Sequence, residues 1–451
     1  MLSRHKRSIG ILGILLCFFL GMFAAYGVGV YNDSEQYIAM HIHREPLYPL
    51  FLAFFRMLAG EGTGLVLAAI AQNLLTVFAI FSLIEYLSRK FSLCLPGELI
   101  LLAFSLMPHL VTKYVSALGI FLENSVMSEA LCIPLFHFFV LFILRVLLEG
   151  KKRDMALSLL FAFLLSMTRG QMMTTILIWM LVMAYWLILH KQYKKLIVPV
   201  FVTVCVFGLR SLSVHTYNYM VTGYFMGNTY GKVNTLTNVI YACDREDGAV
   251  FPEGSLERDF FEVFYEQADA MGANYRYAGN TVAERTAHLE EYHDMLKFQV
   301  LEANMTAYYF SQDINYYELN RLSDMVAGKM IGKLLPECFG QWLYDYILLC
   351  KNGFVRSIAV VHRYINWVAL FLYLAAAILM AVVFCKQKDS HAVCLMGIAL
   401  LFIIANVCAT SLTIMCLSRY MIYGFSLFYM AFFLLFVEWG RRFIKKDADV
   451  E

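Results

Sequence analysis

Charged residues are scarce in this chain, and that scarcity excludes an ordinary water-soluble fold. Asp, Glu, Lys and Arg make up only 16% of the 451 residues, whereas 60% are hydrophobic. The mean hydropathy of +0.63 is far above what a surface in contact with water tolerates. The main solvent of this chain is therefore expected to be the lipid bilayer.

A strong net charge is also missing. The formal net charge is +2, and no basic stripe interleaved with aromatic residues occurs, so a nucleic-acid partner is not expected. The eleven cysteines include no Cys-x-x-Cys pair and most lie in apolar runs, which argues against a zinc site. Cys243, Cys338 and Cys350 lie in the one long hydrophilic segment, where an oxidising environment would allow a single disulfide.

Long apolar runs recur along the chain. A helical crossing takes about 20 apolar residues, because hydrocarbon offers no hydrogen-bond partner to the backbone. The runs predict an all-α polytopic membrane protein with about ten transmembrane helices. The first run follows the basic start Met1–Arg7, and its length and lack of a clear cleavage site favour a retained helix over a signal peptide. The predicted spans are 8–30, 63–88, 98–117, 126–148, 155–168, 171–190, 196–211, 360–384, 392–411 and 419–438.

The distribution of Lys and Arg predicts the orientation of these helices. Basic clusters such as 89–90 and 151–153 fall in loops on one side, together with both termini. Positively charged loops stay in the cytoplasm, so the termini are expected there and the segments 31–62 and 212–359 outside. The expected parts are an N-terminal transmembrane module at 1–211, a mainly helical extracytoplasmic domain at 212–359, and C-terminal helices with a cytoplasmic tail at 360–451.

The first exterior segment concentrates charge next to the membrane. It contains Asp33-Ser34-Glu35 and then His41-Ile42-His43-Arg44-Glu45-Pro46. Carboxylates, histidines and an arginine can deprotonate a hydroxyl and hold a phosphate if the fold gathers them over a groove. The alternative is a solvated loop in which Asp33 caps a following amphipathic helix. The apolar stretch 46–56 is too short to span and is expected to lie in the membrane interface.

Four further charged residues fall near the same exterior face on this topology. They are Lys113 at the end of the third span, Glu129 at the start of the fourth, Arg169 after the fifth and Arg419 at the start of the last. Charge at membrane depth is costly unless it is paired or hydrated, so each is a candidate site residue. The alternatives are that Lys113 extends to the surface and that Glu129 pairs with Arg169 between helices.

These landmarks resemble the GT-C superfamily of membrane glycosyltransferases, especially the polyprenyl-phosphate-sugar-dependent branch related to protein mannosyltransferases and aminoarabinose transferases. That family has an acidic motif after the first helix, a Pro-rich stretch, a Ser-Glu pair, a Thr-Arg turn and a late Arg-Tyr pair. Here Ser34 separates two acids that are often adjacent, and Glu45-Pro46 replaces a frequent Pro-Pro. The matching residues are Asp33-Ser34-Glu35, Arg44-Glu45-Pro46-Leu47-Tyr48-Pro49, Ser128-Glu129, Thr168-Arg169 and Arg419-Tyr420.

The resemblance implies an inverting glycosyltransferase in a bacterial plasma membrane. It would move a sugar from a polyprenyl-phosphate donor to an envelope glycan, lipid or protein acceptor. Asp33 would be the general base, with Glu35 as a second catalytic carboxylate. The two would also be the candidate ligands of a divalent cation, although the metal is left unassigned. Donor-phosphate binding is expected of Arg44, Arg169, Arg419 and Lys113, and substrate binding of His43, Tyr48, Glu129 and Tyr420.

Two other classes share this layout. An O-antigen ligase or polysaccharide polymerase also joins many helices to a large exterior loop, and it would place catalytic residues there, for example Arg245 or His293. A transporter or flippase for a lipid-linked sugar would need polar residues along a path through the bilayer midplane, whereas the charges here lie near one face.

Overall fold

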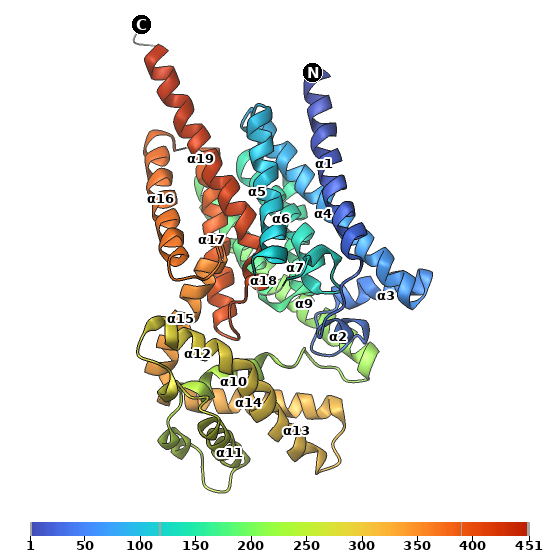
Figure 1. The fold of residues 1–451 in the computed structure, drawn as a ribbon, viewed down its shortest axis with the longest axis vertical. Coiled ribbons are helices and arrows are strands. Elements are labelled where there is room, and N and C mark those ends of the chain that lie inside the picture. The colour runs from blue at the N-terminus through green and yellow to red at the C-terminus, as the bar shows by residue number, and fades with distance from the viewer. Residues whose placement is uncertain (1, 117–118, 389, 449–451) are drawn as a thin grey trace. The chain divides into compact units, whose positions relative to one another are not determined.

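The computed structural model describes residues 2–116, 119–388 and 390–448, and the regular structure in them is all helical (Figure 1). No β-strand occurs in this part of the chain, where an isolated bridge joins Gly29 to Ser125. The predicted fold class, an all-α polytopic membrane protein, is confirmed.

Nine helices in the described residues are long and apolar enough to cross a membrane. The remaining predicted span is α7 (Lys152–Thr168), whose 17 residues at about 1.5 Å each fall short of the ~30 Å hydrocarbon core. It nevertheless packs between its neighbours in the chain, α6 and α8. The nine are α1 (Leu2–Tyr26), α4 (Glu61–Lys90), α5 (Leu95–Tyr114), α6 (Ser128–Glu149), α8 (Thr174–Leu189), α9 (Ile197–Thr222), α16 (Ile365–Lys386), α17 (His391–Ser411) and α19 (Tyr423–Ala448). α8 reaches spanning length together with the 3-10 helix that precedes it, as Gly170–Leu189.

Local sequence signals set the ends of these helices. α5 has Pro96 in its first turn, where the missing N–H would have no partner within the helix. α4 carries Arg89 and Lys90 in its last turn, where positive charge interacts favourably with the helix dipole. α6 ends at Gly150, which adopts the left-handed conformation that closes many helices. Such signals explain why the predicted spans lie close to the observed helices.

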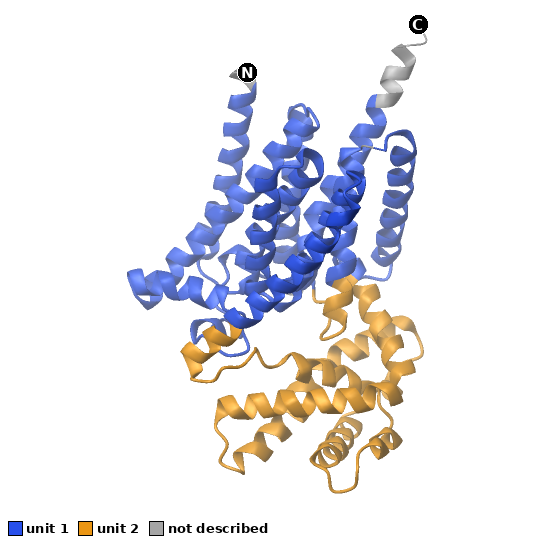
Figure 2. Ribbon diagram, turned by 180° about the vertical axis from the view of Figure 1, so that it is seen from behind, with its two compact units in different colours: residues 1–213, 354–406, 418–451 blue, residues 214–353, 407–417 orange. Residues whose placement is uncertain are grey.

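The chain forms two compact units (Figure 2). Unit 1 comprises residues 1–213, 354–406 and 418–451, and unit 2 comprises residues 214–353 and 407–417. The span predicted at 196–211 continues as α9 to Thr222, so the last turns of this helix belong to unit 2.

In unit 1, α1 begins and α19 ends at the same end of the helical bundle (Figure 1). The short helix α2 (Ser34–Ile38) and the apolar α3 (Leu47–Ala59) lie towards the opposite end. α3 folds back onto α4 at Gly64, where an added Cβ would come within 2.5 Å of the Arg56 Cα. This close approach of the two backbones requires glycine.

Unit 2 is a helical domain with its own core, in agreement with the predicted helical character of this segment. Its core includes Leu236, Phe264, Val300 and Met330, which are all buried. Side-chain caps begin several of its helices, for example Thr281 with Glu284 before α12. The helices are α10 (Gly231–Ala242), α11 (Leu256–Ala270), α12 (Val282–Met295), α13 (Ala303–Phe310), α14 (Tyr316–Glu337) and α15 (Phe339–Arg356).

Candidate active site

Three arginines and two carboxylates of unit 1 meet at the ends of its helices, and we call them the arginine–carboxylate cluster. Its members are Asp33, Arg44, Glu129, Arg169 and Arg419. Asp33 and Arg44 flank α2, Glu129 lies in the first turn of α6, Arg169 follows α7, and Arg419 belongs to the short helix α18 (Ser418–Met421). Folding therefore gathers residues that are far apart in the chain.

Asp33 lies between two of the arginines. Its Oδ1 accepts a hydrogen bond from Arg44 Nη2 at 2.8 Å, and its Oδ2 accepts one from Arg419 Nη1 at 2.9 Å. Burial favours the neutral acid, but the two guanidinium groups outweigh this effect and hold the pKa of Asp33 below its ordinary value. Asp33 occupies the position before α2, yet its side chain makes no capping hydrogen bond, so the capping alternative is wrong.

Glu129 and Arg169 form the buried part of the cluster. Glu129 Oε2 lies 2.5 Å from Arg169 Nη1, and the two side chains are 1% and 13% exposed. The ion pair weighed as an alternative role for Glu129 is thus present. Arg419 Nε lies 3.8 Å from Glu129 Oε1, which connects this pair to Asp33 through Arg419. Because the pair is buried, loss of either partner would leave the other charge buried without compensation.

Tyr37 and Ser128 close the cluster into a ring. Arg44 Nη1 donates to the Tyr37 hydroxyl at 3.2 Å, and that hydroxyl lies 2.9 Å from Ser128 Oγ. Arg169 Nη1 donates to the same Ser128 Oγ at 3.0 Å. Because every link has a partner on both sides, the arginine side chains are held in place before any ligand binds.

Tyr420 packs against two of the arginines. Its ring centre lies 4.9 Å from the Cζ of Arg169 and 5.0 Å from the Cζ of Arg419, and its hydroxyl accepts a hydrogen bond from Arg419 Nη2 at 3.0 Å. Gln171 and Asn406 both donate to the backbone carbonyl of Tyr420, at 3.1 and 2.9 Å. These contacts fix α18 and hence Arg419.

The cluster carries one net positive charge, because three guanidinium groups face two carboxylates. Asp33 is its most accessible member, with 29% of the side chain exposed, and Arg44 and Arg419 follow at 21% and 18%. Guanidinium groups bind phosphate and carboxylate oxygens through paired hydrogen bonds. The accessible part of the cluster is therefore suited to an anion with an acceptor group beside it.

Four predicted site residues lie outside the cluster. Glu35 is exposed and forms no ion pair with any described residue. Lys113 lies over the ring of Tyr26 and donates to the carbonyl of Gly119, in a local role. The ring of His43 packs beside that of His41, with centres 4.5 Å apart. Tyr48 is fully buried in the core beneath Tyr37, and its hydroxyl donates to the carbonyl of Ser125 at 3.3 Å.

Asp33 and Glu35 do not fit a divalent cation site. Both oxygens of Asp33 accept hydrogen bonds from arginines, and Glu35 does not join it. Among the described residues, no group of three or more His, Cys, Asp or Glu side chains is placed to hold a metal ion. A cation at this position would also face three guanidinium charges.

Several contacts of the site were not expected from sequence. Tyr37, Ser128 and Gln171 connect the charged residues, as described above, and Arg210 of α9 pairs with Glu45 next to Arg44. Tyr37 lies four residues after Asp33, but nothing in the local pattern marks it as a partner of α6. Of these residues, Ser128 and Glu45 belonged to the quoted sequence motifs.

The residues named for a ligase or polymerase belong to unit 2, whereas the arginine–carboxylate cluster belongs to unit 1. Arg245 is exposed at the start of a short 3-10 helix, Arg245–Val250. His293 is 1% exposed, and burial lowers its pKa below the ordinary value. Neither residue therefore belongs to a cluster of charged side chains comparable with the one in unit 1.

Comparisons of the chain with protein-family models, with curated proteins and with solved structures found no match. The geometry of the arginine–carboxylate cluster is therefore the basis for assigning a function.

Proposed function

We propose that this protein is a membrane glycosyltransferase of the GT-C type, which transfers a sugar from a polyprenyl-phosphate donor to an acceptor hydroxyl. One observation carries the proposal: Asp33 lies between Arg44 and Arg419, at 2.8 and 2.9 Å, at the ends of membrane-spanning helices. This reaction needs a group that accepts a proton beside groups that bind phosphate, both within reach of a lipid-linked substrate.

The arginines would act on the donor phosphate. As the bond between sugar and phosphate breaks, negative charge grows on the leaving oxygen, and guanidinium groups already in position stabilise that charge. Arg44 and Arg419 are the accessible pair, whereas Arg169 lies deeper against Glu129. The net positive charge of the cluster favours a phosphate with one excess negative charge.

The donor would approach from the bilayer along α3. This helix begins three residues after Arg44, and Phe54, Met57 and Leu58 expose large apolar side chains on it. A polyprenyl chain could pack along this face while its phosphate contacts the arginines.

Asp33 would receive the proton of the acceptor hydroxyl as that hydroxyl attacks the anomeric carbon. In the free protein the two arginines make Asp33 a weak base. A bound phosphate brings negative charge close to Asp33 and shares its arginines, and both effects raise the pKa of the carboxyl group. Donor binding would thereby activate the base. Attack opposite the leaving phosphate gives inversion.

On this proposal the cluster faces the outside of a bacterial plasma membrane and both termini lie in the cytoplasm. The acceptor would be an envelope glycan, lipid or protein. Basic loops such as 151–153, at the ends of the helices away from the cluster, support this orientation.

The test is sugar transfer by the purified protein in nanodiscs, with radiolabelled polyprenyl-phosphate sugars and membrane-extract acceptors. We expect Asp33→Asn to lower the rate by about 100-fold or more, since a positioned general base contributes at least that much. Glu61→Gln is the matched control, because Glu61 is an exposed carboxylate of the same segment that pairs with Arg56. Transfer by Asp33→Asn at the wild-type rate would overturn the proposal.

A further inference from the structure

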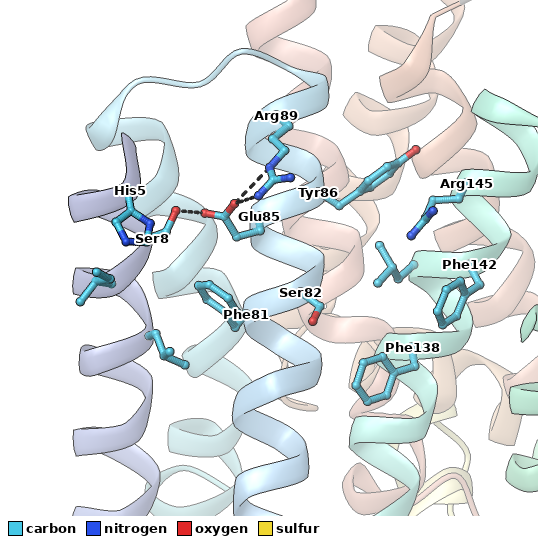
Figure 3. A pocket seen from close by; sticks show the side chains of 13 residues that line it. His5, Ser8, Phe81, Ser82, Glu85, Tyr86, Arg89, Phe138, Phe142 and Arg145 are labelled. Carbon is cyan, nitrogen blue, oxygen red and sulfur yellow. Dashed lines mark hydrogen bonds and ion pairs between the residues drawn. The ribbon is translucent and has the colours of Figure 1, made fainter. Parts of the chain in front are cut away.

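A pocket of about 660 Å³ lies in unit 1 between α1, α4 and α6 (Figure 3). It is formed by the beginning of α1 and the last turns of α4 and α6, at the end of the bundle away from the arginine–carboxylate cluster. The proposed glycosyl transfer does not use this pocket.

The lining of the pocket changes with depth. His5, Arg89 and Arg145 lie at its outer level, one on each helix. Seven or eight residues further into the bundle, about 10 to 12 Å at 1.5 Å per residue, the same helices supply apolar side chains. Those side chains are Leu12 of α1, Phe81 of α4 and Phe138 of α6. Glu85, which pairs with Arg89, also lines the outer level. The pocket thus has guanidinium groups and one carboxylate outside and apolar side chains inside.

The two arginines have donor groups to spare. Arg89 uses Nε and Nη2 on Glu85, at 3.2 and 2.8 Å, and Arg145 uses Nε on the buried Asp154 at 3.2 Å. Arg89 Nη1 and both Nη atoms of Arg145 make no hydrogen bond to any described residue. A second pocket of about 300 Å³ shares both arginines and is also lined by Lys90 and Glu149.

We propose that this pocket binds an anionic phospholipid from the membrane leaflet at that end of the helices. The phosphate would accept hydrogen bonds from Arg89 and Arg145, and the first part of an acyl chain would pack against Phe81 and Phe138. At about 30 Å³ per water-sized group, the volume has room for on the order of twenty such groups, which a phosphate ion alone cannot fill. The change from guanidinium donors to apolar side chains matches the order of groups in a phospholipid.

The position of the pocket favours a lipid over a soluble phosphate compound. Its walls are helices long and apolar enough to cross a membrane, and Ile9 of its lining is an exposed apolar residue. Arginines next to the membrane attract anionic lipids, and here two of them line one pocket.

The experiment is native mass spectrometry of the full-length protein, delipidated in detergent and titrated with phosphatidylglycerol or phosphatidylcholine. We expect one phosphatidylglycerol to bind more tightly than phosphatidylcholine. Arg89→Gln should weaken that binding about tenfold, as expected for a charged hydrogen bond. Ser82→Trp should do the same by filling the middle of the pocket. Arg153→Gln, an exposed arginine outside the pocket, is the control and should bind as the wild type does.

Equal binding of phosphatidylglycerol by wild type, Arg89→Gln and Ser82→Trp would overturn the proposal. Displacement of the lipid by glycerol phosphate at equal concentration would show instead a site for a soluble phosphate. Arg145→Gln is tested together with Asp154→Asn, because the single change would leave a buried carboxylate unpaired. Gel filtration and thermal unfolding establish that each variant is folded.

Discussion

At the scale of single residues, the neighbours of a carboxylate decide what it can do. Asp33 and Glu35 are two residues apart, yet Asp33 is enclosed by guanidinium groups and Glu35 faces solvent. The electrostatic environment of the two therefore differs completely. Because they are close in the chain, the sequence suggested a catalytic role for both. In the structure the backbone of α2 directs their side chains into different surroundings.

The pH dependence of transfer follows from the lowered pKa of Asp33. Its folded-state pKa is below the ordinary 3.8, so its stabilising ion pairs are complete above that value and are lost only as the pH falls through the folded pKa. We expect kcat/KM, which reports the free enzyme, to show no acid limb from Asp33 between about pH 5 and pH 8. A pH–rate profile measures this. A fall of kcat/KM on the acid side of neutral pH that disappears in Asp33→Glu would contradict the lowered pKa of Asp33 in the free enzyme.

Glu35→Gln distinguishes the sequence expectation from the observed geometry. The sequence named Glu35 as a catalytic carboxylate, but it takes part in no ion pair with the described residues. We expect this variant to keep its transfer rate within about twofold, since surface substitutions have small effects. Initial rates beside Asp33→Asn measure it. A loss as large as that of Asp33→Asn would restore Glu35 to the active site.

At the scale of elements, α4 supports the arginine–carboxylate cluster although it contributes no residue to it. Gln72 and Asn73 donate to the carbonyl of Glu123 at 2.8 and 2.9 Å, and Gln72 also donates to that of Ser125. These bonds fix the loop that leads into α6, and with it Ser128 and Glu129. The buried side-chain amides of Gln72 and Asn73 thus donate hydrogen bonds to backbone carbonyls, which lipid cannot do.

The hairpin of α3 and α4 depends on Gly64. An alanine Cβ at this position would lie 2.5 Å from the Arg56 Cα and 2.8 Å from its amide nitrogen, so the helices would have to separate. We expect Gly64→Ala to lower the free energy of unfolding by about 1 to 3 kcal/mol, as overpacking does. Thermal unfolding in detergent measures this.

Gly62→Ala is the matched control for this prediction, since nothing lies within 4 Å of a Cβ added there. Alanine favours a helix over glycine by up to about 1 kcal/mol, so the control should be neutral or stabilised. Equal unfolding temperatures for the two variants would mean that α3 does not pack on α4 as described.

At the scale of the whole molecule, the basic loops predict its orientation. The loop 151–153 lies at the end of unit 1 where α1 begins, and the cluster lies at the other end. We expect green fluorescent protein fused to either terminus to fluoresce, because it folds in the cytoplasm. Alkaline phosphatase fused after Ala59 should be active, and fused after Gly150 inactive. The reverse pattern would place the cluster in the cytoplasm and exclude an exterior reaction.

The sequence by itself determined the all-α membrane fold and the approximate limits of its helices. Both follow from local physics, because a backbone in hydrocarbon must form helices about 20 residues long, and apolar runs of that length are visible in the chain. The same rule failed at the span predicted at 155–168, since α7 is too short to cross, and at one helix end, where α9 continues from its predicted end at 211 to Thr222. The sequence also predicted that the segment 212–359 is mainly helical, but not its individual helices or how they pack.

Tertiary structure decided which charged residues act together. The sequence named Asp33, Arg44, Glu129, Arg169 and Arg419 separately, but it named Glu35 and Lys113 with equal weight. Which of these meet depends on the angles and depths at which helices far apart in sequence pack. No local pattern encodes that geometry. The bond from Arg419 to Asp33 joins residues 386 positions apart. The balance of charge around Asp33, and hence its chemistry, exists only once that contact has formed.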